Sequence, residues 1–266
     1  MTNMTIFSKD RSCQLDLLLR SMIDNFNVPY AATVIYTYSS SFYKKGYDIL
    51  IKEHPNFRFI KETNFKVDVI NSLSGDFKYW TSLCDDYVVQ KRLDHTKEFG
   101  AFDANTDILA LNYRMGPNLK VIYEGDPTEP IPKIVNGIWN WKKAAGRDWK
   151  YPMSLPGQFY RMKDMIDYLP RLDFDCPNWL EGKMMQKRFK HKPLMICFPE
   201  SKVVELVVNR VQNVALKNRF GNVSTEYLNK LWLDGMRVEK EIVYSLPHEI
   251  NRFFNVNFGF EKRRKN

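Results

Sequence analysis

Short apolar runs alternate with amphipathic stretches along the first third of the chain, and this alternation restricts the fold more than any other feature of the sequence. The apolar runs predict strands at residues 5–8, 32–36, 57–60 and 79–84. Apolar residues at helical spacing predict helices over residues 12–27, 42–52 and 65–73. Strands that alternate with helices of this length form βαβ units, so we expect an α/β fold with a central, mostly parallel sheet.

The rest of the chain is less regular. Its patterns predict a strand over 107–114, a loop over 123–132, helices over 162–169 and 176–187, and further elements over 202–214 and 225–233. No repeat, low-complexity segment or Gly/Ser linker divides the sequence. We therefore expect a single domain over 1–266. Its first half, 1–90, has the α/β pattern typical of nucleotide-binding domains. Its second half, 91–260, is expected to complete the binding site, and 261–266 form a basic tail.

Composition restricts the class of protein. Apolar residues make up 44% of the chain and aromatic residues 14%, so the chain can bury a core and is not intrinsically disordered. No run of 18 apolar residues is present, and the first residues lack the pattern of a secretory signal. The four cysteines lie far apart without a C-x-x-C pair, which argues against a zinc ribbon or a disulfide scaffold. The expected location is cytoplasmic.

The chain carries a net charge of +9, and this charge favours anionic partners. Part of the excess lies in the tail and part in the stretch 183–192, which holds five positive residues and no acid. Both segments could simply be solvated. The second also interleaves apolar residues, so a peripheral contact with an anionic membrane is the alternative. No nucleic-acid recognition motif is present, and nucleic acid is not an expected partner.

Two acids, Asp85 and Asp86, directly follow the predicted strand 79–84. The carboxyl ends of parallel strands form the ligand-binding edge of an open α/β sheet. Adjacent carboxylates there can hold Mg²⁺ or Mn²⁺ against a diphosphate, although a polar turn after a strand has the same composition.

Ser8, Lys9 and Arg11 lie between the first predicted strand and the first predicted helix. The N–H groups of a helix start and a nearby cation can bind an anion. The alternative is an ordinary helix start capped by Asp10 and Ser12. The sequence contains no G-x-G-x-x-G, P-loop, G-x-S-x-G or H-E-x-x-H motif, which argues against the corresponding dinucleotide, P-loop and hydrolase sites.

Several motifs in fixed order resemble those of bacterial and viral glycosyltransferases of the family 2-like group, which have the GT-A fold. The similar segments cover nearly the whole chain and are 6–11, 14–21, 43–47, 85–86, 113–118, 139–141, 148–155, 177–181, 209–212, 218–219 and 248–249. The resemblance implies a three-layer α/β sandwich around a mixed, mostly parallel sheet. It also implies a single glycosyltransferase domain whose first half binds a nucleotide-sugar and whose second half binds the acceptor and carries catalysis.

The resemblance also implies roles for individual residues. The residues expected to bind the nucleotide-sugar are Ser8, Lys9, Arg11, Lys45, Asp85 and Asp86. A divalent ion, Mn²⁺ or Mg²⁺, is expected on Asp86 and His248. Glu181, in the segment Pro-Asn-Trp-Leu-Glu, is the expected catalytic base on a glycan or lipid-linked acceptor, and direct displacement then inverts the anomeric centre. The residues expected near the acceptor are Trp149, Lys187 and Arg188.

Two positions depart from the family pattern. Tyr87 stands where a third acid is usual, and Pro156 stands in a segment that often carries an acid and a histidine. Two alternatives to a glycosyltransferase therefore stay open. One is a nucleotidyltransferase on a related fold, and the other is a non-catalytic protein that binds nucleotide-sugars.

Overall fold

A mixed, eight-stranded sheet forms the centre of the molecule. The computed structural model describes residues 1–185, 189–212 and 219–263. The strand order is β3-β2-β1-β4-β9-β6-β10-β8, in which β3, β2, β1 and β4 run parallel. The bounds of these four are β1 (Thr2–Lys9), β2 (Tyr30–Thr37), β3 (Arg58–Lys61) and β4 (Tyr79–Cys84). The expected α/β class with a mostly parallel central sheet is confirmed.

The helices that connect these parallel strands are also those predicted. Their bounds are α1 (Ser12–Asn25), α2 (Ser41–Glu53) and α3 (Phe65–Ser72). Strand β1 is buried along nearly its whole length. Neither row of its side chains meets water, so its polar side chains need partners within the protein. Asn3 Nδ2 donates to the Ser72 carbonyl at 2.7 Å, and the Thr5 hydroxyl lies 3.2 Å from the Ser72 hydroxyl.

The other half of the sheet contains strands that sequence patterns did not reveal. The strand predicted over 107–114 is β6 (Ile108–Asn112). The strands not predicted are β8 (Ile138–Asn140), β9 (Gln158–Arg161) and β10 (Leu194–Cys197). Strand β9 lies antiparallel between β4 and β6, and so joins the two parts of the sheet. These strands have only three or four residues each, too few to show a period.

Three predicted elements in the second half differ in length. The helix predicted over 162–169 ends early, as α5 (Met162–Met165), and a 3₁₀ turn over Leu169–Arg171 follows. Pro170 lies in that turn and lacks the N–H that a continuing α-helix needs. The helix predicted over 176–187 is α6 (Pro177–Met184), and 186–187 lie outside the described residues. The element predicted over 202–214 contains β11 (Val203–Leu206), and residues 213–214 also lie outside the described residues.

Two smaller sheets complete the fold. One has the order β5-β11-β13-β7 and the other pairs β12 with β14. The elements not yet named are β5 (Tyr87–Val89), β7 (Val121–Tyr123), β12 (Met236–Val238), β13 (Ile250–Phe253), β14 (Phe260–Lys262), α4 (Lys97–Ala104), α7 (Thr225–Leu233), α8 (Lys240–Tyr244) and a 3₁₀ turn (Trp141–Lys143). The predicted basic tail thus begins inside a strand. None of the helices in the described ranges could span a lipid bilayer, since none is both long and apolar enough.

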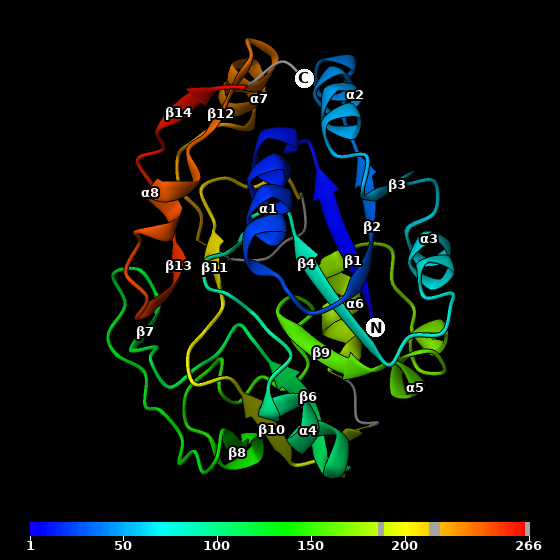
Figure 1. Ribbon diagram of the computed structural model, residues 1–266, viewed down its shortest axis with the longest axis vertical. Helices are drawn as coiled ribbons and strands as arrows, with labels where there is room; N and C mark the ends of the chain where they lie inside the picture. Colours follow the sequence, from blue (N-terminus) through cyan, green and yellow to red (C-terminus); the bar gives the residue numbers. More distant parts are fainter. Residues whose placement is uncertain (186–188, 213–218, 264–266) are drawn as a thin grey trace.

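Side chains on the two faces of the main sheet enter two separate apolar clusters. Met4 and Ile6 of β1 pack in the cluster that contains most of α1. Phe7 points to the other face and packs in the cluster that contains Phe65 of α3 and Leu180 of α6. Figure 1 shows α1 on the near face of the sheet and α6 beyond it. The expected three-layer arrangement is confirmed.

The start of α1 differs from the capping arrangement considered above. Ser12 is the first helical residue, Arg11 is the N-cap, and no side chain accepts a capping hydrogen bond. The Ser12 hydroxyl instead donates to Asn229 Oδ1 of α7 at 2.9 Å. Asp10 has φ 55°, in the left-handed region, and its Oδ1 accepts from the Ser39 N–H at 2.7 Å. The chain therefore turns sharply between β1 and α1, and the Arg11 side chain is buried.

Candidate active site

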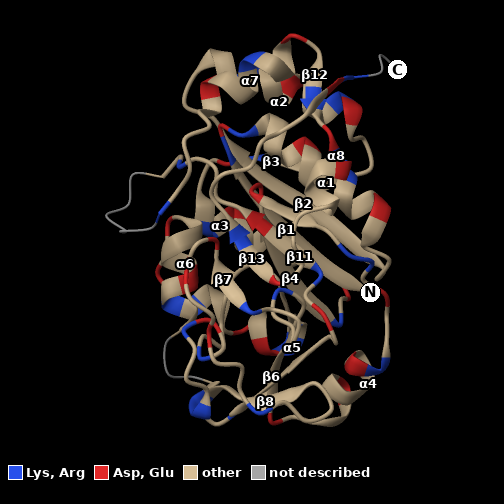
Figure 2. Ribbon diagram, turned by 90° about the vertical axis from the view of Figure 1, so that its left-hand side faces the viewer, with Lys and Arg blue, Asp and Glu red and all other residues tan. Residues whose placement is uncertain are grey.

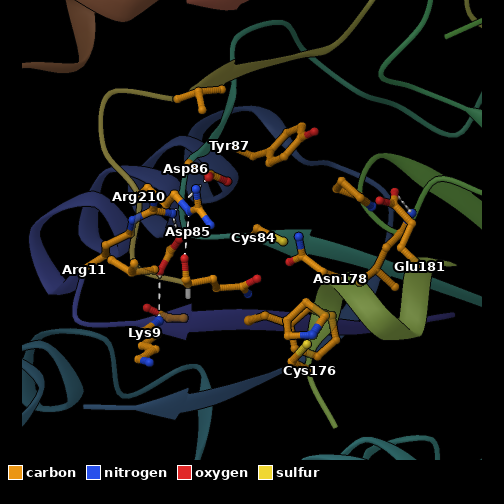
Figure 3. Close-up of a pocket in the computed structure, with 18 of the residues that line it drawn as sticks. Lys9, Arg11, Cys84, Asp85, Asp86, Tyr87, Cys176, Asn178, Glu181 and Arg210 are labelled. Atoms are coloured by element: carbon orange, nitrogen blue, oxygen red, sulfur yellow. Dashed lines mark hydrogen bonds and ion pairs between the residues drawn. The ribbon is translucent and has the colours of Figure 1, made fainter. Parts of the chain in front are cut away.

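A cavity of about 620 Å³ lies at the carboxyl ends of β1 and β4. This is the edge at which open α/β sheets bind ligands. The predicted site residues among those that line it are Ser8, Lys9, Arg11, Asp85, Asp86 and Glu181. In Figure 3, the cluster of Arg11, Asp85 and Asp86 lies on one side and Glu181 on the other, with Asn178 and Cys84 seen between them. The structure therefore brings together side chains from both halves of the chain.

Arg11 bridges the two aspartates. Its Nη1 lies 2.9 Å from Asp85 Oδ1 and 2.9 Å from Asp86 Oδ2. Its Nε donates to Asn209 Oδ1 at 2.8 Å, and its Nη2 donates to the Asn209 carbonyl at 2.7 Å. Burial opposes the guanidinium charge, but the two carboxylates outweigh burial and raise the pKa of Arg11. Arg11 is thus a fixed cation, held by four hydrogen bonds.

The end of β4 places the aspartates. The Asp85 N–H donates to the Phe7 carbonyl at 3.1 Å, which extends the ladder between β4 and β1 by one residue. Asp85 Oδ2 accepts from the Lys9 N–H at 3.1 Å. Asp85 is consequently tied to β1 as well as to Arg11, and faces the cavity from a rigid position.

The pKa of Asp86 lies well above the ordinary value of an aspartate. Burial raises its pKa to about 7, Arg11 opposes this shift, and the charges of Glu205 and Asp85 reinforce it. Its Oδ1 is buried and has no hydrogen-bond partner among the described residues. That oxygen is an acceptor without a partner, and it has almost no surface open to the cavity.

Glu205, which sequence reasoning missed, also lines the cavity. It lies on β11, directly opposite Tyr87 in the antiparallel pair β5–β11. Its Oε2 accepts from the Tyr87 hydroxyl at 2.7 Å and from Arg252 Nε. Arg252 Nη1 in turn lies 3.2 Å from Asp148 Oδ2. A distant strand thus places an acidic side chain beside position 87, although this side chain is already paired. Figure 2 shows acidic and basic segments adjoining near β1 and β13.

Glu181 is held by the loop that leads into β9. Its Oε1 accepts from the Leu155 N–H at 2.8 Å and from the Ser154 hydroxyl at 3.2 Å. Burial raises the pKa of Glu181, and the Leu155 N–H, together with the charges of Arg114 and Arg252, opposes the shift. A carboxylate whose pKa lies above its ordinary value is better matched to proton abstraction near neutral pH.

Ser8 lines the cavity, and its hydroxyl lies 2.7 Å from the hydroxyl of the buried Tyr47.

Three other predicted site residues lie elsewhere. Lys45 is exposed on α2 and does not line the cavity. Trp149 is 1% exposed, packs edge-on against Trp139 with ring centres 5.1 Å apart, and cannot contact an acceptor in this structure. His248 is not among the lining residues, and its charged neighbours are Lys91, Glu200 and Glu249. Lys187 and Arg188 lie outside the described residues.

The ligand set predicted for a divalent metal is not assembled. Asp86 and His248 do not face the same cavity, and the Arg11 guanidinium lies between the two aspartates. Within the described ranges, no three His, Cys, Asp or Glu side chains are grouped closely enough to hold a metal ion. Asp86 Oδ1 is a single unpaired oxygen. These residues therefore do not fit the predicted metal site, and no step of the chemistry below depends on one.

Other lining residues carried no sequence signal strong enough to select them. Trp179, on α6 close to Glu181, is 54% exposed, and Phe220 is 49% exposed. Asn209, which fixes Arg11, follows β11. The segments 177–181 and 209–212 were among the motifs noted in the sequence, but neither Trp179 nor Asn209 was singled out.

No protein-family model matches the sequence. The chain is 29% identical over 247 residues to the bifunctional glycosyltransferase pgtA of Dictyostelium discoideum, a match that covers 78% of this chain and 32% of that protein. The chain thus spans about a third of the length of this curated relative. The match supports the resemblance to glycosyltransferases that the motifs indicate.

Two solved structures are also similar. The crystal structure of S. aureus TarS 1-349 superposes with a TM-score of 0.45 and 12% identity, covering 73% of this chain and 57% of that one. The mannosyltransferase PcManGT from Pyrobaculum calidifontis, in complex with GDP-Man and Mn²⁺, gives a TM-score of 0.36 and 8% identity, covering 66% of this chain and 50% of that one.

Proposed function

We propose that this chain is an inverting glycosyltransferase, which moves a sugar from a nucleotide-diphosphate donor to a hydroxyl group of a glycan or lipid-linked acceptor. The observation that carries the proposal is the shared cavity. A fixed arginine–aspartate cluster lines one part of it, and a half-buried carboxylate on a separate helix, Glu181, lines another. The similarity to pgtA supports the same reaction class.

The donor would lie against the ends of β1 and β4. Asp86 lines the cavity, and its Oδ1 has no partner among the described residues. A small movement that exposes this buried oxygen would let a ribose hydroxyl donate a hydrogen bond to it. The lining residues that supply positive charge are Lys9, Arg11, Arg210, Arg219 and Arg252. In a partly enclosed cavity, such charges stabilise the negative charge that develops on the departing diphosphate.

Glu181 is the proposed base. Its carboxylate would accept the proton of the acceptor hydroxyl while the hydroxyl oxygen forms a bond to the anomeric carbon. The bond from that carbon to the diphosphate oxygen breaks at the same time, and the nucleoside diphosphate leaves with the bonding electron pair. Attack from the side opposite the leaving group inverts the anomeric centre.

The acceptor would enter past Trp179 and Phe220. Both rings line the cavity, and both are about half exposed. Aromatic faces of this kind can pack against the apolar face of a sugar ring. Trp179 precedes Glu181 by two residues on α6, and both side chains line the cavity, so an acceptor sugar on this ring would lie in the same cavity as the proposed base.

Two measurements test the proposal. Thermal-shift titration with nucleoside diphosphates and nucleotide-sugars should raise the melting temperature, because a ligand that binds the native state stabilises it. With a nucleotide-sugar that binds, product analysis should find nucleoside diphosphate. A nucleotidyltransferase would instead release pyrophosphate from a nucleoside triphosphate incubated with a sugar phosphate, so the two assays together separate sugar transfer from nucleotidyl transfer. Glu181→Gln should keep donor binding and lose about 10²–10⁴ in transfer rate.

The proposal fails if no nucleoside diphosphate or nucleotide-sugar shifts the melting temperature. It also fails if the protein releases pyrophosphate from a nucleoside triphosphate but no nucleoside diphosphate from a nucleotide-sugar. Transfer by Glu181→Gln at the wild-type rate would leave the glycosyltransferase assignment intact and remove Glu181 as the base.

A further inference from the structure

We infer that Ser154 and the Leu155 N–H form a clamp that positions the Glu181 carboxylate and leaves its Oε2 as the atom that receives the acceptor proton. The inference rests on the proposed function, since it assigns how the proposed base is oriented. Ser154 and Leu155 are positioning residues in this scheme, because they act through Glu181.

The hydrogen bonds to Glu181 are all on one oxygen. Oε1 accepts from the Leu155 N–H at 2.8 Å and from the Ser154 hydroxyl at 3.2 Å. Oε2 has no hydrogen bond to any of the described residues, and it is not among the buried unpaired atoms. Because Glu181 lines the cavity, Oε2 is the oxygen that an acceptor hydroxyl can reach.

The clamp is anchored to the central sheet. The Ser82 hydroxyl of β4 donates to the Leu155 carbonyl at 2.5 Å, and the Tyr160 hydroxyl of β9 donates to the Ser154 carbonyl at 2.7 Å. The Gly157 N–H donates to the Ser82 carbonyl at 3.1 Å. Ser154 is 2% exposed. Both clamp residues are therefore fixed by buried contacts to two strands, as precise positioning requires.

The clamp also acts on the charge of Glu181. Donors to a carboxylate stabilise its ionised form, which is the form that accepts a proton. The groups that interact with this carboxylate from the surrounding elements are the cations Arg114 and Arg252 and the neutral side chains Tyr151, Tyr160 and Cys84. Loss of the Ser154 hydroxyl removes one stabilising donor while these charges stay in place. The pKa of Glu181 should then rise further.

The test is the pH dependence of transfer by Ser154→Ala. A base with a raised pKa is protonated over a wider range, so the acidic limb of kcat should move to higher pH. We expect kcat on the alkaline plateau to fall about tenfold to a hundredfold, since a misplaced group loses about this much. The Kd for the donor should stay within about twofold of the wild-type value. Ser154→Thr keeps the hydroxyl, so the acidic limb of its kcat profile should return to the wild-type pH.

Ser72→Ala is the matched control. Ser72 is also buried, and its hydroxyl donates to the Val69 carbonyl at 2.7 Å, but it does not line the cavity. This variant should lose stability without moving the pH profile. If Ser154→Ala fails to fold, Ser154→Cys has nearly the same size and only a weak donor, and it should move the limb in the same direction.

The outcomes separate the two hypotheses. Loss of transfer in Glu181→Gln, together with an unmoved acidic limb in the folded Ser154 variant, overturns the clamp and leaves the proposed function standing. Full transfer by Glu181→Gln overturns the base and the clamp together. The clamp is supported if the acidic limb of kcat moves to higher pH in Ser154→Ala and returns to the wild-type pH in Ser154→Thr.

Discussion

At the scale of single residues, Arg11 shows how the site is held together. A guanidinium has five N–H donors in a fixed plane, and here it donates to two carboxylates and to the side-chain and main-chain carbonyl oxygens of one asparagine, Asn209. The partners come from the end of β4 and from the residues after β11. One side chain therefore fixes the relative position of three parts of the chain.

Arg11→Gln should lower the free energy of unfolding by about 3–5 kcal/mol, because it leaves buried carboxylates without their counter-charge. Urea denaturation measures the change. Arg92→Gln is the control. Arg92 also pairs with an aspartate, Asp94, but is 72% exposed, and exposed ion pairs contribute about 0–1 kcal/mol. Equal unfolding midpoints for the two variants would contradict the structural role given to Arg11.

Asp86 should make the protein less stable as pH rises. Its pKa is raised in the folded state, so the folded protein holds this proton more tightly than the unfolded chain does. Stability therefore falls as pH rises from the ordinary aspartate pKa toward about 7. Asp86→Asn keeps an oxygen for Arg11 but cannot ionise. Unfolding free energies measured from pH 4 to about pH 7 should decline less steeply in the variant, and parallel curves would rule the effect out.

At the scale of elements, the sequence predicted the parts of the site that depend on local order. Asp85 and Asp86 follow a strand that is buried along nearly its whole length, and Arg11 directly precedes a helix with clear periodicity, so their meeting at one sheet edge could be predicted. Glu205 could not, because its place depends on β11 pairing with β5, far away in sequence. Trp149 was expected near the acceptor because it lies in a family-like motif, but a local motif does not distinguish a core tryptophan from an exposed one such as Trp179.

The turn before β9 needs glycine. Gly157 has φ +81°, and a Cβ there would lie 2.6 Å from Arg114 Cβ. Gly157→Ala should therefore cost about 1–3 kcal/mol of stability and reduce transfer by displacing Ser154 and Leu155. Gly100→Ala, in α4 with open space around the position, should instead stabilise the protein by about 0.5–1 kcal/mol. Thermal unfolding measures the change in stability of both variants. A Gly157→Ala variant as stable as the wild type would show that position 157 does not need glycine.

At the scale of the whole molecule, the cavity exists only where the two halves meet. The first half supplies Arg11 and the aspartates, and the second supplies Asn209, Glu205 and Glu181. No segment taken alone contains the charges that we assign to donor binding and proton transfer.

Removal of divalent metal should leave nucleotide binding largely intact. The space between Asp85 and Asp86 holds a guanidinium, and the described residues do not group into a metal site. We expect the Kd for a nucleoside diphosphate, measured by calorimetry, to agree within about twofold between EDTA and Mn²⁺. Binding that is detected only with Mn²⁺ would show that the diphosphate itself completes a metal site on Asp86.

The position of β9 has a consequence for synthesis of the chain. Strand β4 pairs with β1 on one side and with β9 on the other, and β9 follows β4 by more than seventy residues. Until β9 has emerged from the ribosome, β4 is an edge strand with unpaired backbone groups, and such edges favour association between chains. A fragment that ends near residue 90 should therefore aggregate, whereas one that extends beyond Arg161 can close that edge.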